Sequence, residues 1–189
     1  MFAAFFLAAA IGIPLGLFAG TFRSMEALIL PVTGAIRYMP VAAFIPLVIL
    51  WVGIGESSKV LIIFLGVVFV NIMMIADAVK FVPFDMLNSA YTLGATRAQV
   101  VRKVILPAIG PSIVDTLRVN VSGAWNYLVV AELIASSEGL GFRIMRAQRF
   151  LQTEDIFVCI LIIGLIGIAL DMSFQILSRR LFTWTHNGT

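Results

Sequence analysis

The sequence is poor in the residues from which most metal and catalytic sites are built. It has one cysteine, Cys159, inside an apolar run, and one histidine, His186, in the polar tail. A lone cysteine excludes a disulfide within the chain and a cysteine-based metal site, and a lone histidine leaves a histidine-ligated metal centre without ligands. We therefore expect no metal site and no catalytic residues in this chain.

Charge is also scarce. Only 12% of the 189 residues are charged, whereas 61% are hydrophobic, and the net charge of +3 comes from lysines and arginines spread through the chain. Such a dispersed charge does not favour nucleic acid as a partner. The apolar fraction exceeds what a water-soluble domain of this size can bury, so the composition predicts a protein whose solvent is the lipid bilayer.

Long apolar runs recur along the chain. A helix needs roughly 20 mostly apolar residues to cross the hydrocarbon core. The first run lacks a basic leading region and a small-residue cleavage site, so we interpret it as a spanning helix rather than a signal peptide. The sequence predicts an all-α, polytopic membrane protein with about five transmembrane helices: Phe2 to Gly20, Leu28 to Gly53, Val60 to Val79, Ala108 to Ala135, and Ile156 to Leu177.

Small residues recur at every fourth position of the first run, at Ala8, Gly12, Gly16 and Gly20. Such a stripe lets another helix backbone approach closely. Packing within the chain is the interpretation we favour over a seam between two subunits.

Two segments between the runs, 80–103 and 136–155, are too long to be simple turns. The excess of lysine and arginine marks the cytoplasmic side of a membrane protein. This rule places the first of the two segments in the cytoplasm, on the side that carries Arg23, Lys80, Arg97, Arg102, Lys103, Arg179 and Arg180.

The cytoplasmic segment has the pattern of a helix-turn-helix. Gly94 is expected to end a first short helix. Thr96 followed three residues later by Gln99 is a capping-box pattern, so a second helix is expected to begin at Arg97. Leu106-Pro107 interrupts this helix at the membrane. We expect an elbow between two spans that docks into a groove on a partner protein.

This elbow resembles the EAA loop of the permeases of binding-protein-dependent ABC importers. Asn88 and Ser89 replace the leading glutamate and first alanine of that loop, whereas the glycine and the leucine-proline pair match. The resemblance implies a cytoplasmic coupling loop over 80–107 that contacts an ATPase subunit. The residues it singles out are Asn88, Ser89, Ala90, Gly94, Ala95, Leu106 and Pro107.

The resemblance extends over almost the whole chain and is to the nitrate, sulfonate and taurine (bicarbonate) group of these permeases. It implies one permease domain over 1–189 that lacks the first of the group's six helices. The motifs that carry it are Arg37-Tyr38-Met39-Pro40, the run from Leu50 to Glu56, Ala124-Trp125, Ala131-Glu132, Gly139-Leu140-Gly141, the run from Ile163 to Gly167, and the run from Arg179 to Trp184.

The chain contains no G-x-x-x-x-G-K-[ST] loop for nucleotide phosphates. We therefore expect no cofactor in this chain, with ATP and Mg²⁺ bound by a separate ATPase partner. The resemblance also implies a second permease subunit, as a homodimer, and an extracytoplasmic solute-binding protein. The implied location is the bacterial plasma (inner) membrane, and the implied cargo is a small organic or inorganic anion.

Charged residues within or at the edges of the predicted spans need an explanation, because an unpaired charge there is costly. Asp115 and Arg118 are three residues apart, so an ion pair within one helix and a role in transport are equally supported. Glu132 is expected to reach the lipid headgroups. Asp171 is expected to be a buried partner for a neighbouring helix.

An anion pathway needs positive potential without tight binding. The candidate pathway residues are therefore Arg37 and Arg118, with Trp125 and Asn126 as lining. Packing is the more frequent role of such aromatic residues. The alternatives are an ion-coupled secondary transporter, which Asp115 keeps open, a truncated non-functional permease remnant, and an intramembrane enzyme, against which the lack of an interior histidine argues.

Overall fold

A computed structural model of the chain describes residues 1–181, and every element in that part is helical. The all-α prediction is therefore confirmed. In chain order the elements are α1 (Phe2–Thr21), α2 (Arg23–Ile36), the 3-10 helix η1 (Val41–Phe44), α3 (Ile45–Val52), α4 (Glu56–Lys80), α5 (Phe84–Thr92), α6 (Arg97–Val100), the π-helix η2 (Val101–Ile105), α7 (Leu106–Ala108), α8 (Gly110–Ala135), α9 (Leu140–Arg149) and α10 (Thr153–Leu181).

Three helices, α1, α4 and α10, are each long and apolar enough to cross a membrane. Two further spans are present if each of two bent pairs counts as one, so the described residues hold up to five. The prediction of about five spans is confirmed. The second of these spans bends by 83° and the fourth by 57°.

Proline accounts for both bends. In the second span, α2 ends at Ile36 and η1 begins at Val41, and Pro40 between them has extended backbone. Proline has no N–H to donate and disfavours helical backbone in the residue before it. In the fourth span, Pro107 and Pro111 flank the break at Ile109, and neither proline can donate a backbone hydrogen bond.

The core is built on the contact between α1 and α4. A Cβ added to Gly12 would lie 2.7 Å from the Cβ of Asn71, and one added to Gly16 would lie 2.7 Å from the Ile72 carbonyl oxygen. One added to Gly20 would lie 2.6 Å from the Cβ of Val79. The predicted stripe therefore packs within the chain, as expected, because only glycine lets the two backbones approach this closely.

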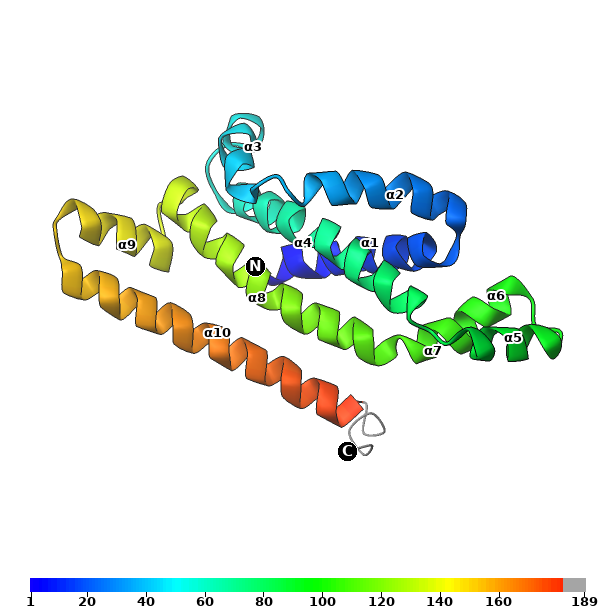
Figure 1. Ribbon diagram of the computed structural model, residues 1–189. Helices are drawn as coiled ribbons and strands as arrows, with labels where there is room; N and C mark the ends of the chain where they lie inside the picture. Colours follow the sequence, from blue (N-terminus) through cyan, green and yellow to red (C-terminus); the bar gives the residue numbers. More distant parts are fainter. Residues whose placement is uncertain (182–189) are drawn as a thin grey trace.

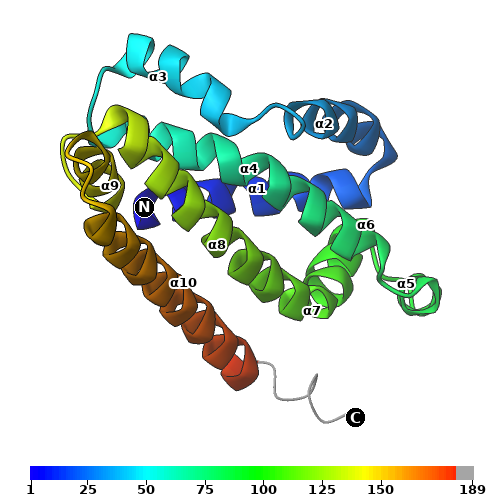
Figure 2. The same ribbon diagram turned by 60° about the vertical axis from the view of Figure 1, so that its left-hand side comes forward.

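The connections between the helices gather at the two ends of the bundle (Figures 1 and 2). The elbow formed by α5, α6, η2 and α7 lies at the same end as the α1–α2 connection and the end of α10 (Figures 1 and 2). Lys80 and Glu26 pair across this end at 2.6 Å. Helices α3 and α9 lie at the opposite end. The segment 136–155 is not a plain loop, because it contains α9 with Arg143, Arg146 and Arg149.

Candidate coupling elbow and membrane cavities

The elbow turns at Gly94. The Gly94 N–H donates to the Tyr91 carbonyl at 2.9 Å, and the Ala95 N–H donates to the Ala90 carbonyl at 3.1 Å. This is the hydrogen-bond pattern of a Schellman motif, in which the residue after the helix takes a left-handed conformation. Gly94 has a φ of +81°, which a residue with a Cβ rarely adopts. A glycine therefore stands where the backbone requires one.

The second helix of the elbow begins as predicted, at Arg97. The Gln99 N–H donates to Thr96 Oγ1 at 3.4 Å, and the Thr96 N–H donates to Gln99 Oε1 at 2.8 Å. This reciprocal pair is a capping box, and it satisfies two N–H groups that the first helical turn leaves without partners. The helix then widens into the π-helix η2 ahead of Pro107, which cannot donate a backbone hydrogen bond.

One side of the elbow packs against the bundle, and the other side is exposed. Val100 and Ile105 are buried and pack in one cluster with Ile75 and Val79 of α4. On the open side Leu93 is 88% exposed. A hollow of about 600 Å³ lies on the elbow, lined by Met86, Ser89, Ala90, Leu93, Lys103, Val104, Pro107 and Ala108.

The seven residues predicted for the coupling loop fall into two groups. Ser89, Ala90 and Pro107 line the hollow. The other four, Asn88, Gly94, Ala95 and Leu106, lie on the same elbow, where all but the half-buried Ala95 are exposed. The structure thus places the predicted set on one elbow, because the turn at Gly94 folds α5 back against η2.

Arg118 on α8 pairs with Asp171 on α10. Its Nε donates to Oδ1 at 2.7 Å, and its Nη2 donates to Oδ2 at 2.8 Å. This two-bond geometry matches the guanidinium to the carboxylate and joins the two helices. Of the two alternatives left open for Asp115 and Arg118, the ion pair within α8 does not form, because Arg118 pairs with Asp171 instead. The expectation that Asp171 partners a neighbouring helix is confirmed. Asp171 is half-exposed rather than buried, with 44% of its side chain accessible.

Trp125 and Asn126 lie beside this pair. The Trp125 indole N–H donates to the Ile163 carbonyl at 3.1 Å, and its ring packs near Gly167. A groove of about 350 Å³ runs between α8 and α10, lined by Ser122, Trp125, Asn126, Ile163, Gly164, Gly167, Ile168, Leu170 and Asp171. Trp125 therefore has a packing role here as well as a place on the groove wall.

Glu132 caps α9. The Gly141 N–H donates to Glu132 Oε2 at 3.0 Å. Gly141 is in the first turn of α9, where N–H groups lack helical partners and a carboxylate is favourable. Gly139 and Gly141 let the side chain fit, since a Cβ on either would collide with Glu132.

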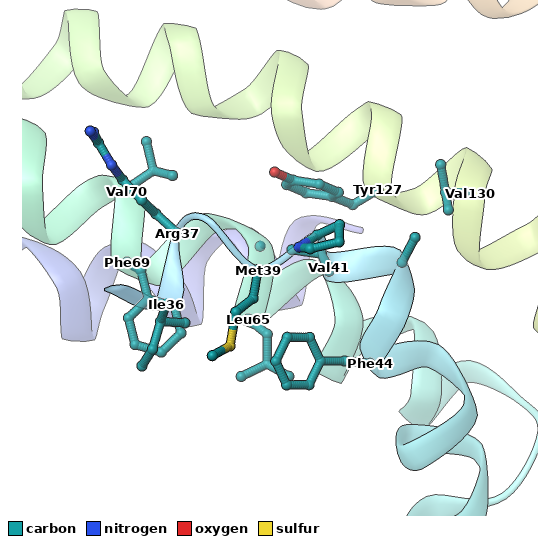
Figure 3. Close-up of a pocket in the computed structure, with 13 residues that line it drawn as sticks. Ile36, Arg37, Met39, Val41, Phe44, Leu65, Phe69, Val70, Tyr127 and Val130 are labelled. Atoms are coloured by element: carbon teal, nitrogen blue, oxygen red, sulfur yellow. The ribbon is translucent and has the colours of Figure 1, made fainter. Parts of the chain in front are cut away.

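Arg37 lies at a different cavity, one formed at the break of the second span. This cavity measures about 530 Å³ and is lined by Ile36, Arg37, Met39, Pro40, Val41, Ala42, Phe44, Leu65, Gly66, Phe69, Val70, Tyr127 and Val130. Figure 3 shows Met39, Phe44 and Leu65 together on one side of the α2–η1 linker. The Tyr127 hydroxyl is turned towards the Arg37 side.

The four candidate pathway residues are therefore not one site. Arg118, Trp125 and Asn126 lie on the side of α8 that faces α10. Arg37 lines the cavity that α4 and α8 form with the broken span. The split has a simple cause: consecutive residues of a helix point about 100° apart, so Trp125 and Asn126 face the groove while Tyr127 faces the cavity.

A pair of amides in the core was not predicted from the sequence. Asn71 on α4 is fully buried, and its Oδ1 accepts a hydrogen bond from Asn120 Nδ2 on α8 at 2.6 Å. The Nδ2 of Asn71 has no hydrogen-bond partner among residues 1–181. Polar residues inside apolar runs were the available signal, since buried amides in a membrane protein usually bond across helices.

Some expectations lie at or beyond the limit of the described residues. No group of three or more His, Cys, Asp or Glu side chains that could hold a metal occurs in residues 1–181. His186 and the end of the run from Arg179 to Trp184 lie outside the described part.

These observations define a helical membrane protein with a helix-turn-helix elbow at one end. A family model described as the binding-protein-dependent transport system inner membrane component matches residues 12–183. The chain belongs to this family, which is one of ABC transporter permeases and not of enzymes. Family members are inner membrane proteins, and the family normally carries no cofactor. The family is one of binding-protein-dependent importers, which implies ATPase and binding-protein partners.

Curated relatives agree with this placement. The chain is 38% identical over 181 residues to a putative ABC transporter permease protein of Methanocaldococcus jannaschii, which covers 95% of this chain and 68% of that protein. It is 38% identical over 181 residues to the taurine transport system permease protein TauC of Escherichia coli, which covers 96% of this chain and 66% of that protein. It is 36% identical over 183 residues to the putative aliphatic sulfonates transport permease protein SsuC of Bacillus subtilis, in an alignment that covers 97% of this chain and 66% of that protein. The chain thus spans about two thirds of the length of these relatives.

The fold is that of a solved ABC transporter. An inward-facing structure of the MetNI methionine ABC transporter aligns with a TM-score of 0.80 at 19% identity and covers 95% of this chain and 89% of that one. At this identity the match supports the fold alone.

Proposed function

We propose that this chain is the permease subunit of an importer for a small organic or inorganic anion of the nitrate, sulfonate, taurine or bicarbonate class. The names of two relatives, which specify taurine and aliphatic sulfonates, support the organic sulfonates within that class. A partner ATPase binds ATP and Mg²⁺ and supplies the energy. This chain provides the passage.

In the assembly that we propose, two copies of this chain form the pore and each copy contacts one ATPase subunit. The residues 80–107 are the coupling loop, within a single permease domain that covers 1–189. An extracytoplasmic solute-binding protein delivers the anion at the opposite end. The elbow and helices α3 and α9 lie at opposite ends of the bundle, which supports this division of roles (Figure 1).

The observation that carries the proposal is the construction of the elbow. It is rigid, because the Schellman turn at Gly94 and the capping box at Thr96 fix its two short helices. It is fastened to α4 through Val100 and Ile105, so a force on the elbow reaches the bundle. Its open side exposes apolar side chains around a hollow, as a docking surface for a partner requires.

A polar stripe on α8 supports a passage between two copies. Asp115, Ser122 and Asn126 lie on one face of this helix and are exposed in the single chain. Polar residues in a spanning helix normally face a bundle interior or a water-filled cavity rather than lipid. In the proposed dimer this face, with Arg118, Trp125 and Asn126, borders the passage.

The test is to tag the chain, purify it from native membranes in mild detergent and identify the proteins that co-purify in stoichiometric amount. An ATPase subunit is the expected partner, and the complex in proteoliposomes, supplied with its solute-binding protein, should accumulate the anion only with ATP. Uptake that follows an ion gradient without ATP would instead support a secondary transporter. If no ATPase co-purifies, the coupling proposal is wrong.

A further inference from the structure

The cavity at the break of the second span has the size and composition of a ligand pocket. Its volume of about 530 Å³ lies within the range, roughly 300 to 1,000 Å³, that small-molecule sites usually have. Its walls are apolar except for Arg37 and Tyr127. Such a pocket, apolar with a few polar groups, favours a molecule that has an apolar part and a polar or charged part.

Arg37 lacks a carboxylate partner. None of the ion pairs formed within residues 1–181 includes it. Its guanidinium lies over the Tyr38 ring, 5.0 Å from the ring centroid, and its Nη2 donates to the Tyr38 hydroxyl at 3.3 Å. These contacts orient the cation without neutralising it.

Arg118 provides the contrast. Both of its hydrogen bonds to Asp171 are short, so its charge is already matched by a carboxylate. An anion that bound Arg118 would have to compete with Asp171, whereas an anion at Arg37 would meet an unmatched charge. Of the two arginines singled out as pathway candidates, the charges favour Arg37.

The break in the span creates the site. Pro40 ends the helical path after α2, so the linker 37–40 leaves a space that a continuous helix would fill. Gly66 lets the Tyr127 ring lie directly against α4, because a Cβ at that position would collide with the ring. Figure 3 shows the result. Arg37 and the Tyr127 hydroxyl lie on one side of the α2–η1 linker, and Met39, Phe44 and Leu65 lie on the other.

We propose that Arg37 and the cavity lined by the α2–η1 linker, α4 and α8 bind an anion that carries a short apolar body. The anionic group contacts the Arg37 guanidinium, and the apolar body lies against Met39, Phe44 and Leu65. This inference rests on the proposed function, and it narrows the cargo to amphipathic anions, such as alkanesulfonates, in preference to bare inorganic oxyanions.

The first experiment measures equilibrium binding of labelled butane-1-sulfonate to the purified permease–ATPase complex in nanodiscs, together with its ATP-dependent uptake in proteoliposomes. Arg37→Gln should weaken binding about tenfold or more, the usual loss for one charge-assisted hydrogen bond. Arg37→Lys should retain part of the affinity. Arg143→Gln, which removes an exposed arginine on α9, is the matched control and should bind normally.

The second experiment tests the apolar wall by size. Ala42 lines the cavity, so Ala42→Phe reduces its volume. This variant should bind hexane-1-sulfonate much less well than methanesulfonate, whereas the wild-type complex should prefer the longer chain. A uniform loss for both probes would indicate general damage and would overturn the assignment of this wall.

The outcomes separate the two levels of the proposal. ATP-dependent uptake with unchanged binding in Arg37→Gln would overturn the inference and leave the proposed function intact. So would a co-purifying phospholipid in the cavity that butane-1-sulfonate does not displace. A wild-type complex that takes up no anion with ATP when its solute-binding protein is supplied would overturn the proposed function itself.

Discussion

At the scale of single residues, the glycines of α1 determine how closely the bundle can pack. Gly16→Ala places a Cβ 2.7 Å from the Ile72 carbonyl oxygen, which is backbone and cannot rotate away. We expect this variant to lose about 1–3 kcal/mol of stability, the usual cost of overpacking. Gly164→Ala in α10 is the matched control, since its Cβ would contact nothing. Thermal unfolding of the detergent-solubilised protein measures both, and equal midpoints would contradict the α1–α4 contact.

The ion pair between α8 and α10 gives a second prediction at this scale. Arg118→Gln and Asp171→Asn should each destabilise the protein, because each leaves the other charge unmatched in the membrane. The double variant should be more stable than the sum of the two losses predicts. A double-mutant cycle on thermal stability measures this coupling. Strictly additive losses would mean that the two groups do not interact in the folded protein.

At the scale of elements, the turn of the elbow can be tested without disturbing the membrane helices. Gly94→Val puts a β-branched residue at a φ of +81° and should prevent the turn, so ATP-driven uptake is lost while membrane insertion persists. Gly94→Asn is the matched variant, since asparagine tolerates this conformation better than most residues. If Asn restores uptake, the glycine is needed for the turn. If Asn assembles with the ATPase as poorly as Val does, the partner also approaches the backbone closely at this position.

The elements that follow local rules were predictable from sequence. Arg97 as a helix start follows from Thr96 and Gln99, because a capping box is a contact within four residues. The apolar runs predicted the number of spans, because the hydrophobicity of a span belongs to one continuous segment. The 83° bend was harder to predict, since Pro40 marks a break but not its angle, which depends on packing against α4 and α8.

Side-chain pairing across helices could not be read from the sequence. Asp115 is closer in sequence to Arg118 than Asp171 is, yet Arg118 pairs with Asp171, which is 53 residues away on another helix. The groove and the cavity depend equally on how α8 is rotated against its neighbours. That rotation decides that Trp125 and Tyr127 face different spaces, and spacing along one helix does not reveal it.

At the scale of the whole molecule, the surface of the single chain divides into an apolar side and a polar stripe. Phe157, Leu161 and Leu165 of α10 are each more than 60% exposed, as side chains in contact with lipid would be. Asp115, Ser122 and Asn126 of α8 are also exposed but are polar. Because lipid cannot satisfy polar groups, the division indicates which face meets water or a second subunit.

Cysteine labelling in the assembled transporter tests this division. The native Cys159 is buried and is first replaced in Cys159→Ala. In that background Ser122→Cys and Asn126→Cys should react with a charged, membrane-impermeant thiol reagent, because a thiolate forms in water but not in lipid. Leu165→Cys is the matched control on α10 and should stay unlabelled until the protein is denatured. Labelling of Leu165→Cys with protection of both α8 positions would reverse the assignment and place the passage on the α10 side.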